Sequence, residues 1–349
     1  MPKICLIHPH VKDVVSALHY LRLDGCGLES SLEWDSCRPD ILIATEWIYY
    51  RKDLFKLFRT LYPYASLRVC CLQEAIEADM NLFDYACGFS DAARPDGRFF
   101  RLPSPLELYS DFLNGEKNNP IQSSGAALVE LSGKTGFCNF LYSNPGAHPM
   151  RDRIFHKLCE YKKVDSLGKH LNNVGIPGTG YSGGHKAEGL ELKRRYKFSV
   201  AAENACFPGY TSEKLLTSLQ AHTVPVYWGN PNVASEVNPE CFIDASSFPD
   251  LDSLLERVRE IDCDDALWAK IISAPWFTRE QMKLHELRTA AYREKMAGIL
   301  AGGFPAALPE GYHENLYRKR FFSGDFPFER PSLLSRVAAL MFTRRTSRS

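Results

Sequence analysis

Acidic, amide, phenolic and amine side chains gather around one turn of this sequence. An apolar run over residues 198–202 predicts a buried strand, and the chain then turns through Cys-Phe-Pro-Gly into a predicted helix with Thr211 or Ser212 as its N-cap. The polar residues of the turn are Glu203, Asn204, Tyr210, Glu213 and Lys214. Free N–H groups at a helix N-terminus attract anions, and a nearby lysine adds a full positive charge. We therefore expect this turn to bind a phosphate-like ligand; a capped surface helix would explain Glu213 alone but not the whole cluster.

The composition carries no excess of either charge. The chain has 349 residues, with 42 Lys and Arg against 42 Asp and Glu. General nucleic-acid binding usually needs a basic excess, so no nucleic-acid partner is expected. The eleven cysteines include no CxxC pair, which favours reduced, buried thiols over a disulfide framework or a zinc ribbon. With no signal-peptide pattern and no apolar run of membrane-spanning length, a cytoplasmic protein is expected.

Short apolar runs alternate with helical patterns in both halves of the chain. The expected strands cover residues 4–8, 40–45, 67–72 and 85–89, and then 137–143, 196–202, 223–228 and 241–244. The expected helices cover residues 51–62, 149–161, 212–221 and 250–261. A polar stretch over residues 113–125, rich in turn formers, is the expected linker. This alternation predicts two α/β units with parallel sheets, and ligands at the carboxyl ends of the strands.

The polar turn also matches a known family. Glu203-Asn204, Tyr210 and Ser212-Glu213-Lys214, followed by Val-Pro-Val-Tyr-Trp-Gly over residues 224–229, resemble the signature of the α-1,3/4-fucosyltransferases, glycosyltransferase family 10. The family usually has Thr in place of Ser212. Residues 81–89, 98–103 and 143–152 resemble further segments of bacterial members, so the likeness covers about residues 67–255.

The resemblance implies a GT-B fold, in which two facing Rossmann-like domains enclose a cleft. It implies an acceptor-binding domain over residues 1–130, a GDP-fucose-binding domain over residues 131–310 and an extension over residues 311–349. The implied reaction is an inverting transfer of L-fucose from GDP-β-L-fucose to a hydroxyl of a GlcNAc- or Glc-containing glycan of the N-acetyllactosamine type. The product linkage is α-1,3 or α-1,4.

The same resemblance gives roles to the residues that bind the donor. Arg151 and Lys214 are expected to contact the pyrophosphate and to stabilise GDP as it leaves. Glu213 is expected to accept hydrogen bonds from the ribose hydroxyls. Asn204 and Tyr210 are expected to fix the diphosphate and the nucleotide.

An inverting transfer also needs a general base for the acceptor hydroxyl. In the family the base is an acid ten positions before the Asp that corresponds to Asp84, which here is Glu74. The family context is commonly Gly-Glu-Asn, whereas this chain has Gln-Glu-Ala, and Glu77 is the rival base. Glu203 is expected to lie next to the fucosyl centre.

No metal site and no required cofactor are expected, although a stimulatory divalent metal stays open. Asp-x-Asp triplets occur at residues 250–252 and 262–264, but they fall at the two ends of a predicted helix rather than at a strand end. Residues 175–184 are glycine-rich and are predicted to form a loop near the donor.

The tail over residues 331–349 holds four arginines and no acid, with apolar side chains that can share one helical face. This pattern predicts a basic amphipathic helix on the inner face of the cytoplasmic membrane, with a frayed end as the alternative. Three other functions stay open: a GT-B enzyme for another nucleotide sugar, a non-catalytic glycan-binding relative, and a hydrolase with a carboxylate pair.

Overall fold

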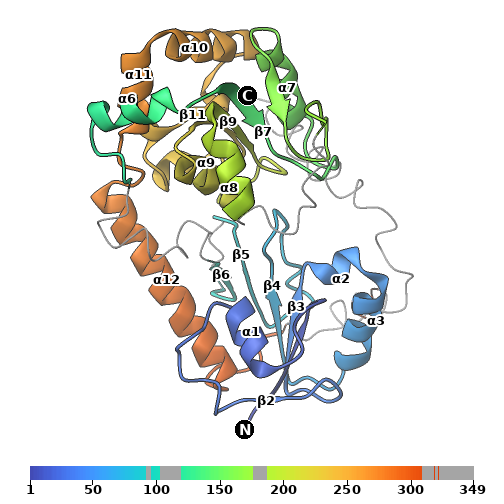
Figure 1. Ribbon diagram of the computed structural model, residues 1–349. Coiled ribbons are helices and arrows are strands. Elements are labelled where there is room, and N and C mark those ends of the chain that lie inside the picture. Colours follow the sequence, from blue (N-terminus) through green and yellow to red (C-terminus); the bar gives the residue numbers. More distant parts are fainter. Residues whose placement is uncertain (92–95, 103–118, 176–186, 309–317, 319–320, 322–349) are drawn as a thin grey trace, which may run out of the picture. The chain divides into compact units, whose positions relative to one another are not determined.

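The chain folds into two compact α/β units, each built around one parallel sheet (Figure 1). The computed structural model describes residues 1–91, 96–102, 119–175 and 187–308, together with residues 318 and 321. One unit comprises residues 1–103 and 287–349, and the other comprises residues 104–286. The division into acceptor- and donor-binding domains at residues 130 and 310 stays a prediction.

The sheet of the first unit has six strands, and all of its pairings are parallel. In spatial order the strands are β2 (Glu33–Trp34), β1 (Lys3–Ile7), β3 (Ile41–Thr45), β4 (Leu67–Cys71), β5 (Tyr85–Gly88) and β6 (Phe99–Arg101). Strands β1, β3 and β4 are short apolar runs because helices and loops bury both faces of a parallel sheet. The helices that lie wholly in this unit are α1 (Val14–Tyr20), α2 (Trp47–Tyr50) and α3 (Lys52–Leu61).

The sheet of the second unit has five strands, again all parallel. In spatial order they are β11 (Ile243–Asp244), β10 (Val224–Trp228), β9 (Tyr196–Ala202), β7 (Gly136–Phe140) and β8 (Val164–Ser166). Side chains along a strand alternate between faces. Val200 and Val226 accordingly belong to one core cluster, whereas their neighbours Ala201 and Tyr227 belong to another on the opposite face.

Helices cover both faces of this second sheet (Figure 1). Buried side chains of α7, α10 and α11 pack into the core that contains Val200, and those of α9 pack into the core that contains Ala201. Among the described residues, the helices of this unit are α6 (Ser124–Ser132), α7 (Met150–Cys159), α8 (Ala187–Arg194), α9 (Glu213–Gln220), α10 (Leu251–Cys263) and α11 (Asp265–Ile272). Helix α12 (Arg279–Leu300) begins in this unit and ends in the first. Three 3₁₀ turns are η1 (Val233–Ser235), η2 (Pro239–Cys241) and η3 (Ala245–Ser247).

Both sheets repeat one topology. Numbered within its own unit, each sheet begins with the strand order 2-1-3-4-5. In sheets of this kind the connections reverse direction beside the first strand, and ligands bind outside the carboxyl ends of the strands at that switch point. The topology therefore points to two places: the ends of β1 and β3 in the first unit, and the ends of β7 and β9 in the second.

The expected α/β alternation is confirmed, with some corrected boundaries. The strand expected to reach residue 143 ends at residue 140, and the strand expected over residues 241–244 covers only Ile243–Asp244, because Cys241 ends the 3₁₀ turn η2. The linker expected over residues 113–125 is wrong at its end, because Ser123 accepts the N–H of Ala126 and caps helix α6. Residues 113–118 of that linker, most of the glycine-rich segment and the basic tail lie outside the described residues.

Asp84 ties the segment that follows α12 to the first sheet. Its carboxyl group is fully buried and accepts three backbone N–H groups, from Arg68, Ala307 and Leu308, each at 2.8 Å. A buried donor that loses its acceptor costs about 1–3 kcal/mol. This aspartate therefore stabilises the fold of the first unit.

We predict that Asp84→Ala lowers the free energy of unfolding of the first unit by about 3 kcal/mol, because three buried N–H groups lose their acceptor. The measurement is urea denaturation followed by circular dichroism. Asp24→Ala is the control, since Asp24 forms only an exposed pair with His19 and such pairs contribute little. Equal midpoints for the two variants would contradict the anchoring role.

Candidate functional site

The switch point of the second unit is occupied by Arg151 and Asn204. Asn204 follows β9, and Arg151 lies in the first turn of α7, which follows β7. The guanidinium Nη2 donates to the side-chain oxygen of Asn204, and Nη1 donates to the carbonyl of Asn144 at 3.2 Å. Arg151 thus joins the segments that follow β7 and β9, at the edge of the sheet where the topology predicts a ligand.

The buried charge of Arg151 has no carboxylate counter-ion among the described residues. The residue is 1 % exposed, and its guanidinium lies over the ring of Tyr142, 4.1 Å from the centroid. The described part of the chain contributes no carboxylate ion pair to it, and its Nε has no acceptor there. Because a buried, uncompensated cation is costly, this arrangement is suited to an anionic ligand.

Glu203 clamps the start of helix α9. Its carboxylate is fully buried and accepts the N–H of Ser212 at 2.7 Å and the hydroxyl of Ser212 at 2.6 Å. The Lys214 ammonium lies 3.2 Å from the same carboxylate. Burial raises the pKa of Glu203, and the positive charge of Lys214 opposes that rise. Ser212 is the N-cap of α9, as one of the two sequence-based alternatives predicted.

Gly229 leaves the space that the Glu203 side chain fills. Gly229 follows β10, and a Cβ at this position would lie 2.3 Å from Cγ of Glu203. Two carbon atoms cannot lie this close without a bond, so the Glu203 side chain would have to move. The glycine of the Val-Pro-Val-Tyr-Trp-Gly segment is therefore required by the clamp.

Lys214 and Glu213 form part of the same charged group. The Lys214 ammonium lies 3.6 Å from the Glu213 carboxylate as well as near Glu203, so two acids balance its charge. Glu213 sits half-buried in the first turn of α9, where the helix dipole favours an acid. The two cations expected at the donor site thus differ in their surroundings.

Tyr210 is buried rather than exposed at the turn, with 2 % of its surface accessible. Its loop is held by two residues that do not belong to any motif of the sequence. Asn230 accepts the N–H of Gly209 at 2.8 Å, and the fully buried Glu236 accepts the hydroxyl of Thr211 at 2.9 Å. These contacts fix the backbone on both sides of Tyr210.

His148 is a further side chain at this switch point. Its ring stacks on Trp228 with the centroids 4.6 Å apart. The backbone N–H of His148 donates to the carbonyl of Asn204 at 2.8 Å. Nδ1 accepts from the N–H of Met150, so a neutral ring carries its proton on Nε2. Burial lowers the pKa of His148, which favours that neutral form. The sequence alone does not mark His148 as a site residue, because only the structure shows that its ring stacks on Trp228.

Glu74, the expected base, belongs to the first unit. It lies in the turn after β4 and is half-buried, and its carbonyl accepts the N–H of Ile76 at 2.8 Å. The rival Glu77 is exposed, and its carboxylate accepts the hydroxyl of Ser90 at 2.8 Å. Of these two acids, Glu74 thus lies closer to the end of its strand and is less exposed.

Aromatic rings line the switch point of the first unit. The ring centroid of His8, which follows β1, lies 4.6 Å from that of Tyr20 and 5.8 Å from that of Trp47. Burial and the nearby His10 lower the pKa of His8 to about 4. Trp47 follows β3, so neutral rings from both sides of the switch point meet there.

The Asp-x-Asp triplets flank helix α10, as expected: Asp250 is its N-cap and Asp264 its C-cap. Within the described ranges, no group of three or more His, Cys, Asp or Glu side chains could hold a metal ion. The same residues include no helix long and apolar enough to cross a membrane.

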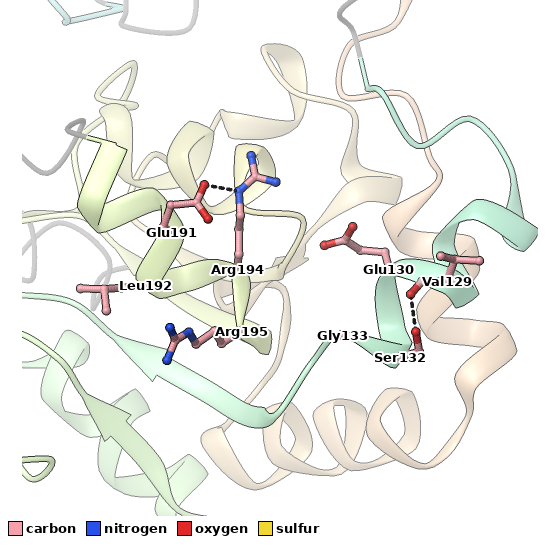
Figure 2. Close-up of a pocket in the computed structure, with 8 residues that line it drawn as sticks. All are labelled: Val129, Glu130, Ser132, Gly133, Glu191, Leu192, Arg194 and Arg195. Atoms are coloured by element: carbon pink, nitrogen blue, oxygen red, sulfur yellow. Dashed lines mark hydrogen bonds and ion pairs between the residues drawn. The ribbon is translucent and has the colours of Figure 1, made fainter.

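A surface pocket of about 650 Å³ lies elsewhere in the second unit (Figure 2). Its lining residues come from α6 and α8 and from the residues that follow them, including Glu130, Glu191 and Arg194. These helices precede β7 and β9, so the pocket is at the amino ends of the strands. None of the site residues expected from the sequence lines it.

The comparisons with known proteins agree with the motif. Residues 131–297 match the family model described as glycosyltransferase family 10 (fucosyltransferase), C-terminal part. An α-(1,3)-fucosyltransferase of Helicobacter pylori is 29% identical over 221 residues, 55% of this chain and 43% of that protein. A GDP-fucose protein O-fucosyltransferase 3 of Bos taurus is 29% identical over 229 residues, 63% of this chain and 44% of that protein.

A crystal structure of an α1,3-fucosyltransferase with GDP-fucose matches with a TM-score of 0.59 and 20% identity, over 84% of this chain and 90% of that one. The two parallel α/β units therefore define a glycosyltransferase fold of the GT-B class. Residues 131–297 are thus similar to the C-terminal part of glycosyltransferase family 10, which confirms the resemblance seen in the motif. It spans less than half the length of the curated relatives that it matches.

We predict that Gly229→Ala disrupts the clamp, because the new methyl group displaces the Glu203 side chain. Binding of GDP, measured by calorimetry, should weaken at least about tenfold, and the melting temperature should fall. Gly125→Ala is the matched control, since a Cβ at Gly125 meets nothing within 4 Å and alanine favours the helix. Normal GDP affinity in the Gly229 variant would show that the donor does not depend on the clamp.

Proposed function

We propose that this protein transfers L-fucose from GDP-β-L-fucose to a hydroxyl group of an acceptor, with inversion at the anomeric carbon. The observation that carries the proposal is the buried, uncompensated guanidinium of Arg151 beside Asn204, at the switch point of a family 10 domain. A diphosphate supplies the negative charge that this site lacks. The match to a structure with bound GDP-fucose supports the same donor.

The donor half of the reaction rests on fixed cations. Arg151 is proposed to bind the diphosphate and to stabilise the charge that develops when GDP leaves, with Lys214 as the second cation. Asn204 and Tyr210 are proposed to fix the diphosphate and the nucleotide, and Glu213 to accept from the ribose hydroxyls. With both cations in place, no metal is required in this proposal, although one could be stimulatory.

The acceptor half rests on Glu74. Its carboxylate is proposed to take the proton of the acceptor hydroxyl while the oxygen bonds to the fucose anomeric carbon from the face opposite GDP. The bond between that carbon and the phosphate oxygen breaks, and GDP leaves with the electron pair. The products are an α-fucoside, GDP and a proton on Glu74. Glu203 is proposed to keep its place near the fucosyl centre through the clamp.

The acceptor is proposed to be a glycan with GlcNAc or Glc, joined through an α-1,3 or α-1,4 linkage. One relative is named for a glycan linkage and another for a protein acceptor, so a protein hydroxyl is the second candidate. Membrane attachment through residues 331–349 and the cytoplasmic location stay predictions.

The test is consumption of labelled GDP-fucose by the full chain, with N-acetyllactosamine, lactose, a folded protein acceptor or no acceptor. Transfer requires an acceptor, whereas a hydrolase releases fucose without one, and a non-catalytic relative binds GDP-fucose and leaves it intact. Turnover of another nucleotide sugar in place of GDP-fucose would overturn the donor assignment.

We predict that Glu74→Ala reduces transfer at least about 1,000-fold while the Kd for GDP changes less than about threefold, because a base acts only on the acceptor hydroxyl. Single-turnover assays and calorimetry measure the two quantities. Glu77→Ala is made in parallel. If transfer is lost in the Glu77 variant and kept in the Glu74 variant, then Glu77 is the base.

We predict that Arg151→Met weakens GDP binding by about 1.5–3 kcal/mol, the usual value of a hydrogen bond to a charged group. The affinity for guanosine, which has no phosphate, should not change. Arg153→Met is the control, because Arg153 lies exposed on the same helix. An equal loss for GDP and for guanosine would place the diphosphate away from Arg151.

A further inference from the structure

Two carboxyl groups lie at one edge of the first sheet. Strands β3 and β4 pair in parallel, with Thr45 opposite Cys71 at their ends. Glu46 is the first residue after β3, and Glu74 lies in the turn after β4. The register therefore brings an acid that no motif contains close to the proposed base.

Glu46 contacts the backbone next to Glu74. The residue is 6 % exposed, and its Oε2 accepts the N–H of Gln73 at 3.1 Å. The side chain of Gln73 in turn donates to the carbonyl of Tyr20 at 3.4 Å. The turn that carries Glu74 is thus held to β3 by Glu46 and to the end of α1 by Gln73.

The surroundings of Glu46 contain no compensating cation within the described ranges. Burial is the largest cause that raises the pKa of Glu46, and the negative charge of Glu74 adds to it, so that the pKa lies at about 7. The titratable groups that face it are Tyr20 of α1, Tyr50 of α2, Cys70 and Cys71 of β4, and Glu74.

We propose that Glu46 is a positioning residue for the base: it holds the backbone of the Gln73–Glu74 turn, so that the Glu74 carboxylate stays where it can take the proton of the acceptor hydroxyl. This inference rests on the proposed function. A general base acts only from a place within hydrogen-bond reach of the hydroxyl, so a loosened turn lowers the rate of the transfer step. It leaves the binding of GDP-fucose unchanged, because the base contacts only the acceptor.

The first arm of the test separates charge from shape. Glu46→Gln keeps an oxygen that can accept the Gln73 N–H but has no charge. The kcat at saturating GDP-fucose should therefore stay within about twofold of the wild type in Glu46→Gln and fall about tenfold in Glu46→Ala, with an unchanged KM for GDP-fucose in both variants. Glu29→Ala, at an exposed acid of the same unit, is the control. A wild-type kcat in Glu46→Ala would overturn the positioning role.

The second arm needs no activity. In Glu46→Ala the Gln73 N–H loses its acceptor, so hydrogen exchange of the peptide over residues 72–76 should become about tenfold faster, whereas Glu46→Gln should stay near the wild type. Unchanged exchange in the alanine variant would overturn the positioning role. If the wild type transfers no fucose, the proposed function fails, and the exchange result still decides whether Glu46 holds the turn.

Discussion

The site in the second unit depends on one buried carboxylate. Glu203 is the first residue after β9, and its carboxylate accepts two hydrogen bonds from Ser212 and lies beside the ammonium of Lys214. An unpaired carboxylate in this fully buried position would cost several kcal/mol, so these partners must stay together for the unit to be stable. The same requirement fixes the start of α9 and keeps β10 free of a side chain at Gly229.

The two units share one sheet topology but carry charged groups of opposite sign at the corresponding ends of their strands. At the switch point of the second unit, Arg151 brings a positive charge that has no counter-ion among the described residues. Beside the switch point of the first unit, Glu46 and Glu74 bring two acids, and the charge of Glu74 contributes to the raised pKa of Glu46. A group transfer from a diphosphate needs both kinds of site, because the leaving group gains negative charge and the incoming hydroxyl loses a proton.

Local sequence patterns predict the strands and helices, whereas contacts between distant residues determine which side chains meet in the site. The strand over residues 196–202 follows from its apolar run, and capping preference limits the N-cap of α9 to Thr211 or Ser212, of which the structure has Ser212. The linker prediction failed at its end because Ser123 begins a helix that the turn-forming composition conceals. Glu46 could not be selected from the sequence, since its proximity to Glu74 depends on the register of β3 against β4.

The sequence assigns Arg151 and Lys214 the same expected role, contact with the pyrophosphate, but the structure gives them different surroundings. The ammonium of Lys214 is balanced by Glu203 and Glu213, whereas the guanidinium of Arg151 lacks an ion pair in the described part of the chain. Removing Lys214 would leave the buried Glu203 carboxylate without its cation and would loosen the turn. Weaker nucleotide binding in such a variant could therefore arise from the lost contact with the nucleotide or from the loosened turn. Removing Arg151 leaves no such acid behind. The net positive charge that an incoming diphosphate meets therefore comes from Arg151, and its substitution reports on phosphate binding more directly than substitution of the lysine.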